Sequence, residues 1–341
     1  MSSCCSQEKR TAGLERNKLV WLVIALLAVL ALSYHVAVLV PFREVLAGYA
    51  RILFWPLVLG LVIGGVIDHY VPRAYVSHVL AGKRRRSILY AVLWGFLMTL
   101  CSHGILALAV QLYKKGASPS SVVAFLLASP WANFPLTLML VGFFGVAQAA
   151  YIILSAIAVA LITGWVFQAL EARGMIEKNP NTVELGDDFD IWKDVRQRLS
   201  GYRFDFARDA RGIARGIAGL AEMVMWWILL GMSLAAAAGA YIPSHFFHQF
   251  MGKSFGGMSV TLAFATVVET CSEGSSPLAF ELYRQTGAVG NALVFLMAGV
   301  ATDYTEIGLL WANAGRRTAL WMPAIAVPLI LLFGHVANMI F

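Results

Sequence analysis

Long apolar stretches separated by short polar ones make up most of the chain. Stretches such as 19–40 and 147–167 run for 21 or more residues without a formal charge. A helix of that length crosses a hydrocarbon core of about 30 Å. We therefore interpret the chain as an all-α polytopic membrane protein. Its nine expected hydrophobic segments are 19–40, 51–71, 87–113, 119–143, 146–168, 218–242, 257–283, 288–313 and 318–340.

The first segment predicts a membrane anchor rather than a cleaved signal peptide, because its apolar run exceeds the h-region length of about 7–15 residues. Composition agrees, since 59% of residues are hydrophobic and 13% are charged, whereas soluble domains carry about 25% charged residues. The net charge of +7 fits the excess of Lys and Arg in membrane-protein loops. The expected partner is the lipid bilayer and not nucleic acid.

Two parts of the chain resemble each other at an offset of 170 residues. "CSHGILALAVQLYKK" from Cys101 aligns with "CSEGSSPLAFELYRQ" from Cys271, and "AFLLAS" later aligns with "VFLMAG". Internal duplication with interrupted helices is typical of secondary transporters. We divide the chain into a cytoplasmic tail (1–18), an additional transmembrane helix and loop (19–50), repeat 1 (51–168), a polar loop (169–217) and repeat 2 (218–341).

The polar loop ends in a stretch, 189–216, that mixes Trp and Phe with Arg at near-helical spacing. This spacing predicts an amphipathic helix at the membrane surface. A solvated linker with some helix is the alternative.

Polar or proline-containing motifs interrupt four of the apolar segments. They are "CSHG" in the third, "SPWANFP" in the fourth, "CSEGSSP" in the seventh and "AGVATDYTE" in the eighth. Proline inside a helix removes a backbone hydrogen bond. Unpaired backbone at membrane depth is tolerated only where protein or a water-filled cavity satisfies it. We therefore expect broken or re-entrant helices at the Cys-Ser-x-Gly motifs.

Positive charges suggest how the segments cross the membrane. With a cytoplasmic N-terminus, a fully crossing third segment places Lys114, Lys115 and the loop 169–217 outside. A re-entrant third segment places these lysines and this loop on the cytoplasmic side. Arg316 and Arg317 are cytoplasmic in both schemes. The positive-inside rule favours the re-entrant scheme, which makes the two repeats inverted. Nine full crossings, with the third segment as one long tilted helix, remain the alternative.

The duplicated cysteines are the main candidates for substrate binding. A thiolate is a soft ligand, and glycine lets backbone approach a ligand closely. The alternative is that both are small buried hydrophobes. No Cys/His metal spacing is present, so no metal or cofactor is expected, although both thiolates suit arsenic(III)-type ligation. The predicted binding residues are Cys101, Ser102, His103, Gly104, Pro130, Asn133, Cys271, Ser272, Gly274 and Ser275.

Carboxylates inside the apolar segments are the candidates for proton coupling, because ionisable groups in a membrane are costly. On a helix, Glu269 and Glu273 share a face, and His103 occupies the position of Glu273 in repeat 1. Pairing with Arg284, Arg316 or backbone N–H groups is the structural alternative, favoured for Glu281. The predicted proton-coupling residues are Glu269, Glu273, Asp303 and Glu306.

Other motifs have ordinary packing interpretations. Gly60 and Gly64, and the "AAAAGA" run at 235–240, are typical of close helix contacts. Trp131 and Phe134 lie between two prolines and either line a pocket for an organic group or pack in the core.

Together these motifs resemble the ArsP-like, or YraQ-type, predicted permeases over about 55–340. The matching stretches are Cys-Ser-x-Gly at 101–104, "KKGAS" at 114–118, "AFLLASP" at 124–130 and "CSEGSSP" at 271–277. The resemblance implies an inner-membrane permease, and the arsenic-resistance branch of that family exports trivalent organoarsenicals. The family's first motif often reads Cys-Ser-Cys-Gly followed by proline. In this chain His103 replaces the second cysteine and Ala107 replaces the proline. The candidate ligands are then the thiols of Cys101 and Cys271 and one imidazole nitrogen of His103.

The sequence thus favours an efflux permease rather than an enzyme. It would bind a thiophilic solute at Cys101 and Cys271 and exchange it for protons through Glu269, Glu273 or His103. No P-loop motif is present. The alternatives are transport of another small anion or sulfur compound, a membrane-bound thiol redox protein, and a non-transporting scaffold. Homo-oligomerisation is left open.

Overall fold

A computed structural model describes residues 19–70, 86–95, 105, 108–110, 112–113, 116–132, 134–180, 206–268 and 272–341. These residues are nearly all helical, and the described ranges contain no strand. Four helices are long and apolar enough to cross a membrane, and six spans result if each of two bent helix pairs counts as one. The expected all-α, multi-pass architecture is confirmed.

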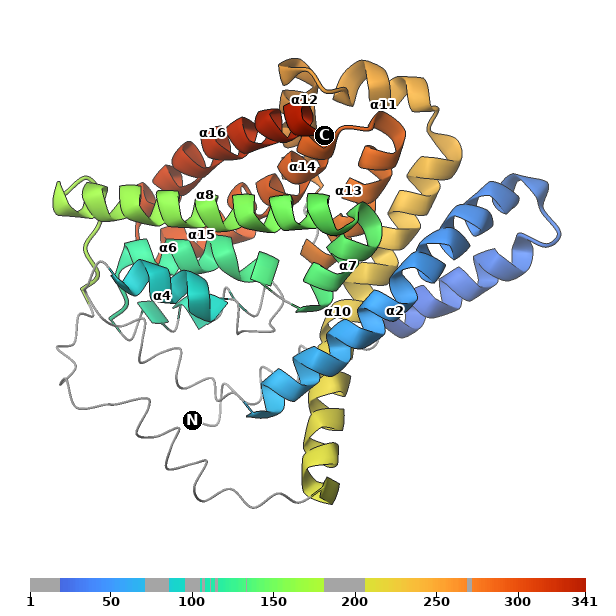
Figure 1. Cartoon of the computed structure of the whole chain (residues 1–341), viewed down its shortest axis with the longest axis horizontal. Helices are drawn as coiled ribbons and strands as arrows, with labels where there is room; N and C mark the ends of the chain where they lie inside the picture. Colours follow the sequence, from blue (N-terminus) through green and yellow to red (C-terminus); the bar gives the residue numbers. More distant parts are fainter. Residues whose placement is uncertain are drawn as a thin grey trace.

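Figure 1 shows the arrangement of the helices. The first helix in the described part is an apolar one over Leu19–Leu32. The elements that follow are η1 (Ala37–Leu39), α2 (Val40–Tyr70), α4 (Arg86–Gly95), α6 (Pro119–Ala128), η2 (Ser129–Ala132), α7 (Phe134–Phe144), α8 (Val146–Ala172), α10 (Phe206–Tyr241), α11 (Ser244–Met251), α12 (Phe255–Val267), α13 (Ser272–Thr286), α14 (Val289–Ala301), α15 (Tyr304–Asn313) and α16 (Arg316–Ile340).

The beginning of the chain differs from the expected segments 19–40 and 51–71. The first helix stops at Leu32, where Ser33 Oγ donates to the carbonyl of Leu30 at 2.6 Å. The second helix, α2, starts at Val40, so the expected loop at 41–50 is helical. Pro41 lies in the first turn of α2, the one part of a helix where proline removes no intrahelical hydrogen bond.

The polar loop is also shorter than expected, because α10 begins at Phe206 and continues unbroken to Tyr241. The start of α10 is held by α2: Asp209 Oδ1 lies 3.4 Å from His69 Nε2, and Gly65 faces Ile217. Residues 206–217 are therefore continuous with the sixth apolar segment in one helix that packs against α2. Residues 181–205 lie outside the described part.

Helix boundaries in the two halves follow the 170-residue offset. In the first half α6, α7 and α8 begin at residues 119, 134 and 146, and in the second α14, α15 and α16 begin at 289, 304 and 316. Gly145 and Gly315 both have positive φ, 84° and 109°, and directly precede α8 and α16. These three helices therefore occur in the same order and at the same spacing in both halves.

Equivalent long helices run antiparallel, as α8 and α16 do across the centre of Figure 1. The hydroxyl of Tyr151 near the start of α8 donates to the carbonyl of Phe333 near the end of α16 at 3.0 Å. In the pair α2 and α10, Tyr241 at the end of α10 donates to Val38 just before α2 at 3.0 Å. Inversion of one half relative to the other requires this antiparallel pairing.

Loops from both halves meet at one end of the bundle. Asn179 Nδ2 donates to the carbonyls of Tyr113 and Ala117 at 2.6 and 2.8 Å. Two residues earlier, Glu177 accepts from the backbone N–H groups of Arg317 and Thr318 at 2.9 and 3.0 Å. The end of the third segment, the loop after α8 and the start of α16 therefore lie together.

A second polar cluster joins loops elsewhere in the bundle. Asn291 Nδ2 donates to the carbonyls of Met251 and Gly252 at 2.9 and 3.0 Å. Asn338 Nδ2 donates to Asn291 Oδ1 at 2.8 Å, and Asn338 Oδ1 accepts from the N–H of Gly290 at 2.7 Å. The end of α11, the start of α14 and the end of α16 are thereby fastened together.

Glycine and alanine allow close packing where the sequence predicted it. A Cβ on Gly60 would clash with the backbone of Pro135, so α2 and α7 touch there. Ala235 and Ala236 in the alanine-rich run are fully buried. The packing interpretation is confirmed for Gly60 and for the alanine-rich run.

Replacing Glu177 by Gln is expected to weaken the start of α16 by about 0.5–2 kcal/mol, the range for losing a helix N-cap. Partial burial raises the pKa of Glu177, but hydrogen bonds from Arg317 and Thr318 outweigh it, so the pKa lies below the ordinary 4.5. This stabilisation is present above pH 4.5 and is lost as pH falls through the lowered pKa. Thermal unfolding of wild type and variant in detergent between pH 3 and 7 tests this. Equal melting points at neutral pH would contradict it.

Candidate functional site

Seven of the predicted site residues lie outside the described part of the chain. They are Cys101, Ser102, His103, Gly104, Asn133, Glu269 and Cys271. The others lie at the start of α13, in η2 and at the junction of α14 with α15, so the geometry of the site comes from these three places.

The seventh segment is broken next to its Cys-Ser-x-Gly motif: α12 ends at Val267 and α13 begins at Ser272. Glu273 in the first turn of α13 is fully buried, and Ser272 Oγ donates to its Oε2 at 3.2 Å. Ser275 and Ser276 are buried as well. The first turn of α13, Ser272–Ser276, is therefore a buried polar turn.

This polar turn is pressed against α10. A Cβ on Gly231 would overlap the carbonyl of Gly274, and a Cβ on Gly274 would lie 2.9 Å from the carbonyl of Trp227. Only residues without a side chain permit this approach. Gly274 was predicted to let the backbone approach a ligand, and in the structure its backbone lies close to α10.

The eighth segment is interrupted between α14 and α15. Asp303 caps α15, and its Oδ1 accepts from the N–H groups of Thr305 and Glu306 at 2.7 and 3.3 Å. Thr302 Oγ1 lies 2.8 Å from Thr266 Oγ1 near the end of α12. The breaks of the seventh and eighth segments are therefore neighbours. Glu306 is 3% exposed.

In the first half, α4 lies against the interruption of the fourth segment. A Cβ on Gly95, the last residue of α4, would lie 2.9 Å from Ser129 Oγ in η2. Next to Pro130, Trp131 is 1% exposed and its Nε1 has no hydrogen-bond partner among the described residues. A buried N–H donor is therefore available in the break of the fourth segment.

A second buried carboxylate was expected to be structural, and its partners explain why. Glu281 on α13 accepts hydrogen bonds from the Tyr49 hydroxyl, Arg284 Nε, Arg284 Nη2 and Gln285 Nε2. A Cβ on Gly239 of α10 would lie 2.5 Å from Oε1. The predicted neighbour Arg284 was visible in the sequence, but Tyr49, which lies 232 residues away in the chain, was not.

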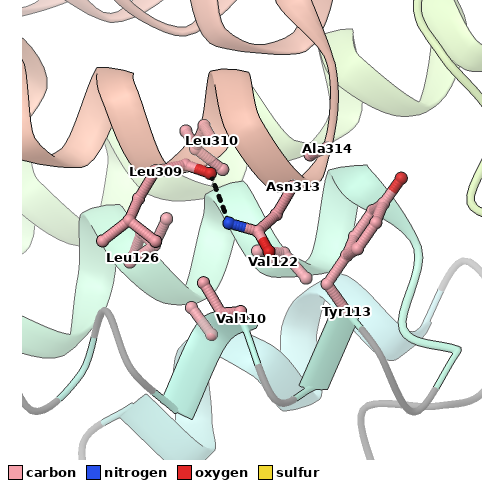
Figure 2. Close-up of a pocket in the computed structure, with 9 residues that line it drawn as sticks. Val110, Tyr113, Val122, Leu126, Leu309, Leu310, Asn313 and Ala314 are labelled. Carbon is pink, nitrogen blue, oxygen red and sulfur yellow. Dashed lines mark hydrogen bonds between the residues drawn. The ribbon is translucent and has the colours of Figure 1, made fainter.

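Figure 2 shows a small pocket between the end of the third segment, α6 and α15. Val110, Leu126 and Leu310 line it with other apolar groups, and Asn313 Nδ2 turns back to donate to the carbonyl of Leu309 at 2.9 Å. None of the predicted binding or proton-coupling residues lines it. This pocket is therefore not formed by the side chains that the sequence predicted for binding solute or protons.

The helical bundle with broken apolar segments defines a multi-pass α-helical membrane protein. A family model described as a predicted permease, ArsP_1, matches residues 42–339, and the chain belongs to this family. The protein "Putative permease Rv2963" of Mycobacterium tuberculosis is 24% identical over 241 residues, which cover 67% of this chain. They cover 59% of that protein, so the chain spans less than two thirds of its relative. No solved structure matches.

Proposed function

We propose that this permease exports a small thiophilic solute, such as a trivalent organoarsenical, across the inner membrane in exchange for protons. The observation that carries the proposal is the buried turn at the start of α13, where the fully buried Glu273 follows Cys271 by two residues. A thiol and a carboxylate two residues apart in the chain would bring solute binding and proton binding next to each other. An ionisable group inside a membrane segment marks a substrate or ion pathway.

The arrangement of loops supports the re-entrant topology over nine full crossings. Nine crossings place the loop after α8 and Arg317 on opposite sides of the membrane, yet Glu177 accepts a hydrogen bond from the N–H of Arg317. A re-entrant third segment places both inside, together with Arg173 and Lys178. Each half then crosses three times, and a cytoplasmic N-terminus satisfies the positive-inside rule.

Transport of another small anion or sulfur compound is the second candidate. It is favoured by the buried Trp131 Nε1, a donor without a partner in the described ranges. Such a donor suits an oxyanion as well as an electron-rich solute. A membrane-bound thiol redox protein is the alternative from another class. In that case Cys101 and Cys271 would form a reversible disulfide, and no solute would be transported.

Everted membrane vesicles test the proposal directly. Wild-type vesicles should accumulate methylarsenite when a proton gradient is imposed, and Cys271→Ser and Glu273→Gln should each reduce the rate to that of empty membranes. Ser276→Ala is a matched control one turn along α13, since its hydroxyl only returns to the carbonyl of Ser272 at 2.9 Å. It should retain most of the rate.

Three outcomes separate the candidates. Absence of arsenical accumulation in wild-type vesicles removes the arsenical substrate and turns the test to oxyanions and sulfur compounds. Accumulation that survives Glu273→Gln removes Glu273 as the proton carrier. A trapped Cys101–Cys271 disulfide in vesicles that move no solute favours the redox alternative.

A further inference from the structure

Aromatic side chains from three helices pack together where α13 meets α2 and α7. The rings of Phe143 and Phe280 are stacked with centroids 4.6 Å apart, and Tyr49 packs edge-on against both, at 6.1 and 6.0 Å. The ring of Phe144 lies 5.8 Å from that of Phe280 and 5.4 Å from that of Tyr283. We call these five side chains the aromatic cluster. It joins α13, which carries the buried polar turn, to two helices from the first half of the chain.

One hydrogen bond to a buried carboxylate crosses the same contact. The Tyr49 hydroxyl donates to Glu281. The other hydrogen bonds to Glu281 come from Arg284 and Gln285, which lie on α13 itself. If α13 moved away from α2, only the bond from Tyr49 would break, and Glu281 would stay paired within its own helix. The contact between α13 and α2 can therefore open without leaving a buried charge unpaired, which would be costly.

The residues equivalent to the aromatic cluster line the pocket of Figure 2. Four cluster residues lie in the duplicated segments, so each has an equivalent at the 170-residue offset. The pairs are Phe280 with Val110, Tyr283 with Tyr113, Phe143 with Asn313, and Phe144 with Ala314. All four equivalents line the pocket. The contact of α13 with α7 and the contact of the third segment with α15 are therefore equivalent. Aromatic rings fill the first, and the second leaves a pocket.

The aromatic cluster and the pocket lie at opposite ends of α8. Phe144 lies just before the start of α8 at Val146. Asn179, beyond the end of α8, donates to the carbonyl of Tyr113 at 2.6 Å, and Tyr113 lines the pocket. Because α8 has 27 residues and is apolar enough to cross a membrane, its ends are about 40 Å apart at a rise of about 1.5 Å per residue. The cluster and the pocket therefore lie toward opposite faces of the membrane.

We propose that the aromatic cluster, with the hydrogen bond from Tyr49 to Glu281, is the closed outer gate of the permease. With the cytoplasmic N-terminus proposed above, α8 ends on the cytoplasmic side, so the pocket faces the cytoplasm and the cluster faces the outside. The conformation is then inward-facing. In secondary transporters one repeat rocks against the other around a fixed site, and here the opening movement separates α13 from α2 and α7. This inference rests on the proposed function and its topology.

The difference between the two contacts suits an exporter. An exporter waits for solute while open to the cytoplasm, so its outer side has to be the more firmly closed one. Glu281 has Gln111 at its equivalent position, and Phe280 has Val110. Val110 offers less apolar surface for burial than Phe280, so the inner contact is held less firmly. The outer gate should therefore open only after solute and protons have bound.

The reactivity of Cys271, which directly precedes α13, measures which side is open. Right-side-out and inside-out vesicles that contain the full-length protein are treated with a membrane-impermeant maleimide, without thiophilic solute. Mass spectrometry of the peptide that carries Cys271 gives the labelling rate from each side. Wild type should be labelled faster from the cytoplasmic side. Tyr49→Phe removes the hydrogen bond and keeps the ring, so it should raise the outside rate by about tenfold, the shift that about 1.4 kcal/mol gives.

Exchanging residues between the two contacts gives an independent test. Phe280→Val gives the outer contact the residue of the inner one, and Val110→Phe does the reverse. Both should raise the outside labelling rate, the first by loosening the outer gate and the second by filling the pocket and favouring closure of the inner side. Val110→Phe should also slow labelling from the cytoplasmic side. A variant that is merely destabilised would be labelled faster from both sides.

Tyr151→Phe is the matched control. It removes a hydroxyl that donates to the carbonyl of Phe333 at 3.0 Å, near the same end of α8 but outside the aromatic cluster, and it should be labelled like wild type from both sides. The gate is overturned if Tyr49→Phe or Phe280→Val leaves the outside rate unchanged, or if wild type is labelled faster from outside. Because no solute is present, these results do not depend on arsenical transport. Failed accumulation of methylarsenite would remove that substrate and leave the gate.

Discussion

Replacing Glu281 by alanine is expected to lower the free energy of unfolding by about 3 kcal/mol or more, because it removes several hydrogen bonds to a buried charge, each worth about 1.5–3 kcal/mol. The carboxylate is 1% exposed and accepts four hydrogen bonds, two of them from Arg284. Its removal leaves the Tyr49 hydroxyl buried without an acceptor and opens a cavity between α2, α10 and α13. Thermal unfolding in detergent, followed by intrinsic fluorescence, measures the loss.

Tyr49→Phe is the matched control for this prediction. It removes one hydrogen bond to a charged acceptor, worth about 1.5–3 kcal/mol, and keeps the aromatic packing against Phe143 and Phe280. The variant should therefore melt between wild type and Glu281→Ala. If the melting temperature of Glu281→Ala lies within a degree of wild type, the hydrogen bonds to Glu281 do not hold α2 against α13.

Gly231→Ala is expected to have the second large effect, a destabilisation of about 1–3 kcal/mol or more from overpacking. The new methyl group would overlap the backbone carbonyl of Gly274, which cannot move aside as a flexible side chain does. Because Gly274 follows Glu273, the start of α13 must shift away from α10. Transport in vesicles should fall together with the melting temperature.

Gly219→Ala provides the control on the same helix. A Cβ at Gly219 meets nothing within 4 Å, so the change should be neutral or add about 0.5–1 kcal/mol through helix propensity. Both variants add one methyl group to α10. Equal behaviour of the two variants would show that the contact of Gly231 with Gly274 does not position the polar turn.

The sequence predicted an all-α, multi-pass membrane protein correctly, because a bilayer imposes a length and a polarity that composition alone reveals. The interruption expected at Asp303 is also seen, between α14 and α15. Helix starts such as Pro119 and Val289 are separated by the same 170 residues as the two Cys-Ser-x-Gly motifs. The start of α10 was missed because Phe206 belongs to a polar stretch whose helix depends on packing against α2. Local patterns cannot show a partner that is distant in the chain.

The candidate site was predictable only in part. A buried Glu273 in a broken apolar segment followed from the cost of charge in a membrane. Asp303 was expected to carry protons, and the structure shows that one of its oxygens caps α15. The contact between Thr266 and Thr302 was not predicted, since nothing in either local sequence indicates that the ends of α12 and α14 meet.

The antiparallel pairing of α2 with α10 also constrains how the chain is made. The residues that these helices join, such as Val38 with Tyr241 and His69 with Asp209, are separated by 203 and 140 residues. During synthesis α2 enters the membrane long before α10 exists, so its packing face, Gly65 included, must first be covered by lipid or by the insertion machinery. The first half is therefore inserted into the bilayer before its packing partners exist. Its final structure forms only after the second half has been synthesised and inserted.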